Sequence, residues 1–271
     1  MGCRMTLAVV VASIISMVNI AHRGLWKEGG VPQNTVEAIQ AAYEAGAQIV
    51  ETDFLLTQSG EIICLHDMHA LATMSSIVKD PQLITPEDRQ RINLGEKMNV
   101  TRVFRIPLIS DVLAVVPKDR VLQAEIKGYG KEYAKRFDDA VKAAGLFETN
   151  ILVSCFDRGV LKDFHRQYPK YRTVWLGCGI EDPDYDLEKI IVEAKAAGFN
   201  VLCPGCAAAR YAGFTCKQAD KVREAGFEFR LFGVNSKDDL SFAAELKATG
   251  FTCDYYKAAF LWAKEIGGIS L

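Results

Sequence analysis

Three short apolar runs in the sequence each end in polar, titratable side chains. They read Ile20-Ala21-His22-Arg23-Gly24, Val50-Glu51-Thr52-Asp53 and Leu65-His66-Asp67. Parallel strands of α/β proteins carry catalytic side chains at their carboxyl ends, where several strands contribute to one site. The three runs therefore predict an active site that different strands build together.

Carboxylates are spaced for a shared site on two of the predicted strands. Glu51 and Asp53 are two residues apart, so both side chains point to one face of a strand, and Glu125 stands in the same relation to Lys127. Buried carboxylates repel one another, and a hard divalent cation with oxygen ligands relieves that repulsion. We predict Glu51, Asp53 and Glu125 as ligands of Mg2+ or Ca2+. The alternative is that Glu125 and Lys127 pair with other charges in the core.

Two histidines and two cations accompany these carboxylates. His22 and His66 end different strands, and an imidazole group can accept or donate a proton near neutral pH. Arg23 and Lys127 supply the positive charge that suits a phosphate group. We therefore predict phosphoryl chemistry, with His22 and His66 as an acid–base pair and Arg23 and Lys127 binding the substrate. The alternative for each histidine alone is a hydrogen-bonded core residue.

The elements that position these residues alternate along the chain. Short β-branched runs alternate with helical periodicity from residue 18 to the end, which is typical of parallel strands joined by crossover helices. The eight predicted strands are Val18–Ala21, Ile49–Leu55, Ile62–Leu65, Val121–Ile126, Ile151–Cys155, Thr173–Leu176, Asn200–Cys203 and Glu228–Phe232. A ninth candidate, Phe251–Cys253, means that one of the nine is wrong or lies outside the main sheet.

Helices are predicted between these strands, and several end in Ala-Gly. They are Thr35–Ala45, Ser110–Val116, Lys131–Ala144, Arg158–Tyr168, Leu187–Ala197, Cys216–Ala225 and Lys237–Lys247. A glycine after the last helical residue supplies the left-handed conformation that stops a helix. No Gly-rich phosphate loop follows the first strand, so the pattern favours an α/β TIM (β/α)8 barrel over a doubly wound open sheet.

The domain organisation follows from the same pattern. We predict an apolar N-terminal extension over residues 1–17 and a single (β/α)8 catalytic domain over residues 18–271. A small insertion after the third strand, at about residues 68–107, interrupts the alternation with prolines and polar residues. Excursions of that length in a compact barrel usually lie over the catalytic face.

Composition limits the partners. The 271 residues are 49% hydrophobic and 24% charged, with a formal net charge of −2, so the chain has no basic excess for a nucleic-acid backbone. A small-molecule phosphodiester is the expected partner, and the sequence does not determine the oligomeric state.

The cysteines and the N-terminus bear on localisation. Eight cysteines, several inside apolar runs, suit buried thiols in a reducing, cytoplasmic compartment, and Cys203-Pro-Gly-Cys206 is better explained as a turn than as a zinc or redox pair. The apolar start of the chain leaves an alternative, secretion or a membrane tether through residues 5–20. Removal of this segment would cut into the strand that carries His22, which favours its retention.

At these residues the chain resembles the glycerophosphodiester phosphodiesterase family. The resemblance rests on an ordered series from residue 18 to the last turn: His22-Arg23-Gly24, Pro32-Gln33-Asn34-Thr35, Glu51-Thr52-Asp53, Thr57-Gln58-Ser59-Gly60, His66-Asp67, Ile106-Pro107-Leu108, Glu125-Ile126-Lys127, Ser154-Cys155-Phe156-Asp157 and Gly233-Val234-Asn235. It implies a TIM barrel that hydrolyses glycerophosphodiesters to glycerol 3-phosphate and an alcohol, with a divalent cation. By position, it implies the same metal ligands, acid–base pair and phosphate-binding residues.

The chain departs from the family pattern at three places. Gln33 stands where the family usually has Glu, Leu71-Ala72-Thr73 lacks an arginine, and Leu231-Phe232-Gly233 lacks a tryptophan. These departures bear on substrate contacts and head-group selectivity, and they leave the metal ligands and histidines unchanged. The alternatives are a related phospholipase D or sphingomyelinase D-like barrel, acting on lysophospholipid or sphingomyelin, and a non-catalytic phosphate- or lipid-binding barrel.

Overall fold

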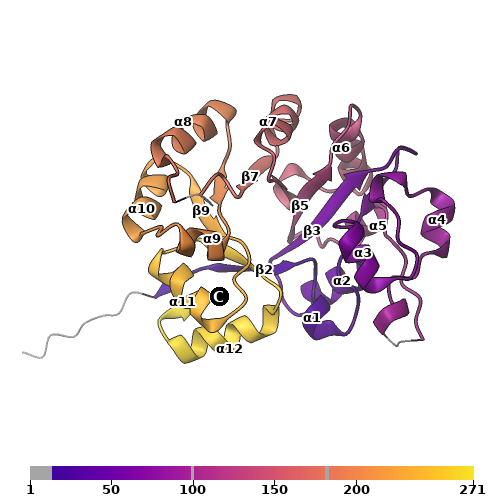
Figure 1. The fold of residues 1–271 in the computed structure, drawn as a ribbon, viewed down its shortest axis with the longest axis horizontal. Coiled ribbons are helices and arrows are strands. Elements are labelled where there is room, and N and C mark those ends of the chain that lie inside the picture. The colour runs from indigo at the N-terminus through magenta and orange to yellow at the C-terminus, as the bar shows by residue number, and fades with distance from the viewer. Residues whose placement is uncertain (1–13, 99–100, 181–182) are drawn as a thin grey trace, which may run out of the picture.

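Eight parallel strands form a closed barrel in the computed structural model, which describes residues 14–98, 101–180 and 183–271 (Figure 1). The strands are β2 (Val18–His22), β3 (Ile49–Leu56), β5 (Val121–Gly128), β6 (Ile151–Cys155), β7 (Arg172–Leu176), β8 (Val201–Cys203), β9 (Glu228–Leu231) and β10 (Gly250–Cys253). Each pairs in parallel with its neighbours, and β2 pairs with both β3 and β10, which closes the ring. The predicted TIM barrel is confirmed.

One of the eight predicted strands lies outside the ring: it is β4 (Ile62–Cys64), which pairs antiparallel with β3. The link between them is a tight turn, in which the Thr57 amide donates to the Glu61 carbonyl and Gly60 has φ 87°. A turn this short can return the chain only in the antiparallel direction, because a parallel return needs a long crossover. The ninth sequence candidate, within β10, takes the place in the ring that β4 does not.

Helices surround the ring (Figure 1). They are α1 (Trp26–Gly29), α2 (Val36–Glu44), α5 (Ile109–Leu113), α6 (Tyr133–Ala143), α7 (Arg158–Gln167), α8 (Leu187–Ala197), α9 (Cys206–Tyr211), α10 (Cys216–Glu224), α11 (Lys237–Glu245) and α12 (Tyr256–Ile266). The glycines of the predicted Ala-Gly stops, Gly46, Gly145, Gly198 and Gly226, all have positive φ. The predicted stop signal therefore acts as expected.

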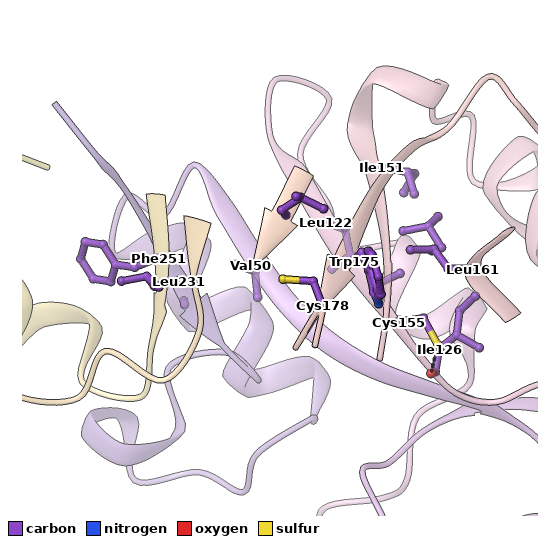
Figure 2. Close-up of a cluster of buried hydrophobic side chains, with 14 of the residues drawn as sticks. Val50, Leu122, Ile126, Ile151, Cys155, Leu161, Trp175, Cys178, Leu231 and Phe251 are labelled. Atoms are coloured by element: carbon purple, nitrogen blue, oxygen red, sulfur yellow. Dashed lines mark hydrogen bonds between the residues drawn. The ribbon is translucent and has the colours of Figure 1, made fainter. Parts of the chain in front are cut away.

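The main core lies between the outward faces of the strands and these helices. Figure 2 shows part of it, including Val50, Leu122, Ile126 and Trp175. A second apolar layer fills the inside of the barrel and contains Ile20 and Val174. Side chains alternate between the two layers along each strand, so every second residue of a strand faces the barrel interior.

The described part of the segment predicted as an insertion contains four short helices beyond β4. They are α3 (Met68–Met74), the 3-10 helix η1 (Pro81–Leu83), α4 (Pro86–Arg91) and the 3-10 helix η2 (Glu96–Met98). Ile63, Leu71 and Ile106 belong to a separate apolar cluster under this segment, and Arg89 is paired with Glu61 at 3.0 Å. Its own core therefore holds the segment as an ordered unit. The domain boundaries themselves stay a prediction.

The two ends of the described chain lie together. Strand β1 (Ile15–Ser16) pairs in parallel with β11 (Ile269–Ser270), just before β2 enters the barrel. Most of the predicted N-terminal extension, residues 1–13, lies outside the described residues. No helix among the described residues is long and apolar enough to span a membrane.

The predicted turn at Cys203 and Cys206 joins two elements. Cys203 ends β8 and Cys206 begins α9, and both side chains are buried. Burial raises the pKa of each thiol to about 12, so both stay protonated at neutral pH. Neither cysteine belongs to a group of three or more potential metal ligands among the described residues, so the turn interpretation is the better one.

Candidate active site

Three buried carboxylates meet where β3 and β5 run side by side. Glu51 and Asp53 lie on β3, and the strand register places Asp53 opposite Glu125 on β5. One ligand atom from each residue lies within 4.8 Å of the others, and all three side chains are buried. Glu51 Oε1 has no hydrogen-bond partner in the described part of the chain. Oxygen ligands this close, with a buried oxygen left unsatisfied, fit a hard divalent cation.

Two cations partly neutralise the three carboxylates. Arg23 Nε lies 3.1 Å from Asp53 Oδ2, and Lys127 Nζ lies 2.6 Å from Glu125 Oε1 and 3.6 Å from Asp53 Oδ1. The cluster therefore holds one negative charge more than it holds positive charges when every group is ionised. This excess is the electrostatic reason for a further cation at the site.

The pKa values of the cluster follow this imbalance. Burial, and then the charges of Asp53 and Glu125, raise the pKa of Glu51 well above its ordinary value. Burial and the charge of Asp53 raise the pKa of Glu125 to about 7. Burial opposes the charge on Lys127, but Glu125 and Asp53 outweigh it and raise the pKa of the ammonium group. Lys127 therefore stays charged.

The turn after β2 brings Arg23 back toward the carboxylates. Arg23 and Gly24 both have positive φ, 57° and 81°, so the chain reverses its direction immediately after His22. A Cβ atom on Gly24 would lie 2.5 Å from the carbonyl carbon of Ala38, which only glycine avoids. The glycine of the His-Arg-Gly sequence therefore permits the turn that places Arg23 beside the carboxylates. Arg23 Nη1 also donates to Gln33 Oε1 at 2.6 Å.

His22 is held by a carboxylate from the far end of the sequence. Its Nδ1 lies 2.6 Å from Asp254 Oδ1, and its Nε2 lies 3.7 Å from Glu51 Oε2. Asn235 fixes Asp254 in turn, because its Nδ2 donates to Asp254 Oδ2 at 3.1 Å and its Oδ1 accepts from the Asp254 amide at 2.8 Å. This network directs Nε2 of His22 toward the carboxylate cluster.

His66 is held by its sequence neighbour. Its Nδ1 lies 2.6 Å from Asp67 Oδ2, while Asp67 Oδ1 caps α3 by accepting from the Ala70 amide at 2.6 Å. Burial lowers the pKa of His66, and the charges of Arg23 and Lys127 add to the effect, although Asp53 opposes it. His66 is therefore neutral at pH 7 and able to accept a proton.

Most of the predicted site residues line one cavity of about 370 Å3. They are His22, Arg23, Glu51, His66, Glu125 and Lys127. Asp53 is fully buried beside them. Phe156, Leu176 and Phe232 form an apolar wall of the same cavity. The structure thus brings all seven predicted residues together.

Two supporting residues were not assigned a role from the sequence. Asp254 directly follows β10, and no local signal distinguishes it from other carboxylates that follow strands. Asn34 was noted only as part of a motif, yet its Nδ2 donates to Asp53 Oδ2 at 2.7 Å and its Oδ1 accepts from the hydroxyl of Thr52 at 2.8 Å. Asn34 has φ 58° in the turn before α2, a conformation that asparagine adopts more readily than most residues, so the residue type just before the helix cap is the sequence signal.

The fold and the site together define a (β/α)8-barrel enzyme with an acidic centre at the carboxyl ends of its strands. The model of the glycerophosphoryl diester phosphodiesterase family matches residues 22–258. The chain therefore belongs to this family of phosphodiesterases.

Relatives and solved structures agree with this assignment. The chain is 28% identical over 243 residues to a glycerophosphodiester phosphodiesterase of Bacillus altitudinis, covering 87% of this chain and 93% of the relative. It is 31% identical over 171 residues to one of Caldanaerobacter subterraneus, covering 60% and 68%.

Among solved structures, a putative glycerophosphoryl diester phosphodiesterase of Silicibacter pomeroyi superposes with a TM-score of 0.79 at 19% identity, covering 94% of this chain and 95% of that one. A phosphodiesterase of Oleispira antarctica, in complex with the product sn-glycerol-3-phosphate, superposes with a TM-score of 0.75 at 17% identity, covering 91% and 96%. These likenesses support the barrel fold.

Proposed function

We propose that the protein hydrolyses glycerophosphodiesters to glycerol 3-phosphate and an alcohol, with a divalent cation held by Glu51, Asp53 and Glu125. The observation that carries this proposal is the buried carboxylate cluster, which lies in one cavity with two cations and two carboxylate-bound histidines. Membership of the family and the product bound by the Oleispira relative support the substrate class. The names of these relatives do not favour the sphingomyelinase-like alternative.

The phosphate group of the substrate would lie between Arg23 and Lys127. Both cations line the cavity beside the carboxylates, so they stabilise negative charge as it builds on the phosphoryl oxygens in the transition state. The divalent cation supplies Lewis-acid polarisation of the same group when it is bound. Mg2+ and Ca2+ both accept an all-oxygen ligand set of this kind.

Proton transfer falls to the two histidines. We assign His66 as the base, because burial lowers its pKa and leaves the imidazole neutral. His22 is assigned as the acid that protonates the leaving alkoxide, with Nδ1 bound to Asp254 and Nε2 directed at the site. Asp254 orients the ring through its contact with Nδ1.

The test is an assay of glycerol 3-phosphate release from a panel of glycerophosphodiesters. We expect activity that EDTA abolishes and that added Mg2+ or Ca2+ restores. His22→Ala and His66→Ala are each expected to lower kcat by about 100- to 10,000-fold, because each removes one proton-transfer group. The matched control is His69→Ala, which removes an exposed imidazole of the same helix region and should leave kcat unchanged. Near-native activity of either histidine variant would contradict the acid–base assignment.

A further inference from the structure

Gln123 is a buried amide on the floor of the active-site cavity. It lies on β5 two residues before Glu125, on the same inward face, and the strand register places it opposite Glu51. Its side chain is 1% exposed and lines the same cavity as the histidines. Because β5 runs toward the mouth of the barrel, Gln123 lies one layer deeper than Glu125.

The side-chain oxygen of Gln123 has no hydrogen-bond partner among the described residues. A buried amide oxygen without a hydrogen bond is unfavourable, and such groups in proteins are almost always satisfied. Ile20 and Val174, two apolar side chains of the barrel interior, offer no donor. The Gln123 side chain lines the cavity, so its oxygen is available to a ligand that donates a hydrogen bond.

The two arms of a glycerophosphodiester differ in what they can donate. The glycerol arm always carries two hydroxyl groups, whereas the alcohol differs from one substrate to another. One side of the cavity is apolar and offers the glycerol arm no acceptor. It is formed by Phe156, Leu176 and Phe232. The carboxylate oxygens of Glu51 and Glu125 are assigned to the cation. Gln123 is therefore an acceptor on the cavity floor that matches a hydroxyl.

We propose that the side-chain oxygen of Gln123 accepts a hydrogen bond from the terminal hydroxyl of the glycerol arm. That hydroxyl is the one farther from phosphorus, so it reaches deepest when the phosphate lies beside Arg23 and Lys127. The glycerol arm then occupies the floor, and the alcohol head group points to the mouth. This assignment rests on the proposed function and makes Gln123 a residue that determines specificity for glycerol.

The experiment combines one substitution with one change of substrate. Wild type and Gln123→Met are assayed on glycerophosphocholine and on 2-hydroxypropyl phosphocholine, which lacks only the terminal hydroxyl. Removing one partner of a buried hydrogen bond is expected to lower kcat/KM roughly 10- to 100-fold. For wild type, we expect kcat/KM to be lower on the analogue than on glycerophosphocholine by this factor. Gln123→Met should lower kcat/KM for glycerophosphocholine by the same factor relative to wild type, and should change kcat/KM for the analogue little.

A control variant and a second readout separate this role from a structural one. Leu176→Met changes the apolar wall without removing a polar group, so it should alter both substrates by the same factor. Competitive inhibition by glycerol 3-phosphate and by 2-hydroxypropyl phosphate should reproduce the pattern in dissociation constants, which do not depend on the chemical step. Thermal melting of each variant reports whether it folds.

Several outcomes overturn the proposal. An equal loss on both substrates means that Gln123 supports the barrel, and no loss means that its oxygen does not contact the glycerol arm. If Gln123→Met fails to fold, the comparison of the two substrates with wild type still tests the proposal, because equal kcat/KM for the two substrates contradicts the hydrogen bond. Failure of the wild type to hydrolyse any glycerophosphodiester overturns the proposed function itself and is recognised before any variant is made.

Discussion

The two ends of the barrel both carry charged side chains on strands, and they balance those charges in opposite ways. At the end where the strands begin, Glu228 accepts hydrogen bonds from Arg172 at 2.5 Å and from Arg230 at 2.7 Å. Burial opposes the charge on Glu228, but these two arginines outweigh it and lower the pKa of the carboxyl group. Here one carboxylate faces two cations.

At the end where the strands finish, three carboxylates face two cations, and the pKa values of Glu51 and Glu125 are raised. The difference shows which end needs a further ion. At the first end the excess charge is positive and lies partly on Arg172, whose side chain is 50% exposed to water. The second is left with excess negative charge, which is the expected state of a site that needs a cation and a substrate.

The largest expected effect comes from removing a charge at the catalytic end. Glu51→Gln should lower kcat by about a thousandfold, because the cation loses a ligand and with it several kcal/mol of transition-state stabilisation. The metal-free variant should be at least as stable as wild type, since one repelling charge is gone. Steady-state kinetics and chemical denaturation in EDTA measure the two effects. A lower stability of the metal-free variant would contradict the account of excess charge.

The opposite end should respond in the opposite way. Glu228→Gln is expected to lower the free energy of unfolding by about 2 kcal/mol, because it leaves the buried guanidinium of Arg230 without its charged partner. The value is kept modest because Glu228 is 32% exposed. Urea denaturation measures it, and kcat/KM should stay within about threefold of wild type.

A matched control for that variant is Glu188→Gln. Glu188 pairs with Lys221 at 2.7 Å on the surface, where both side chains are more than half exposed. Such pairs contribute little, so a change below about 0.5 kcal/mol is expected. Equal effects of the two substitutions would remove the distinction between a buried and an exposed pair.

The smallest effect is a pH dependence of the metal-free protein. The folded pKa of Glu125 is about 7, above its ordinary value of 4.5, so the folded chain retains a proton that the unfolded chain has lost between these values. Stability should therefore fall as pH rises through this window, by at most about 1.4 kcal/mol per pH unit, and added Mg2+ or Ca2+ should remove the slope. Denaturation curves at several pH values, with and without cation, provide the measurement.

The opposite end again has the opposite sign. The folded pKa of Glu228 is lowered, so its contribution is present above the unfolded pKa and is lost as pH falls through the folded one. Glu228→Gln should weaken the loss of stability at acidic pH. It should leave in place the fall in stability between pH 4.5 and about 7 that comes from Glu125. Loss of both pH effects in that variant would show that the two ends are not independent.

The sequence predicts the catalytic end better than the elements around it. Glu51, Asp53 and Glu125 follow from period-two spacing at strand ends, a rule that depends only on local geometry. Asp254 lies 232 residues from His22, and their contact exists only because β10 closes the ring beside β2. Ring closure is a property of the whole chain, so no local pattern could report it.

The sequence leaves open which of two short apolar runs belongs to the ring, for a related reason. Ile62–Cys64 and Gly250–Cys253 are both short and apolar, and only their pairing differs. The turn at Gly60 sends the first back along β3, while a helix of normal length precedes the second. Hydrophobic periodicity predicts which residues of a strand face inward, but it does not predict which strands pair with each other. Pairing depends on the length of the connection between the strands.

The pairing of β1 with β11 places both described ends of the chain beside the beginning of β2. The carboxyl ends of the barrel strands, where His22 and the carboxylates lie, are at the other pole of the molecule. A chain immobilised on a sensor surface through Leu271 would hold the mouth of its barrel toward the flowing solution. The carboxyl end is therefore a suitable attachment point for surface-based measurements of ligand binding.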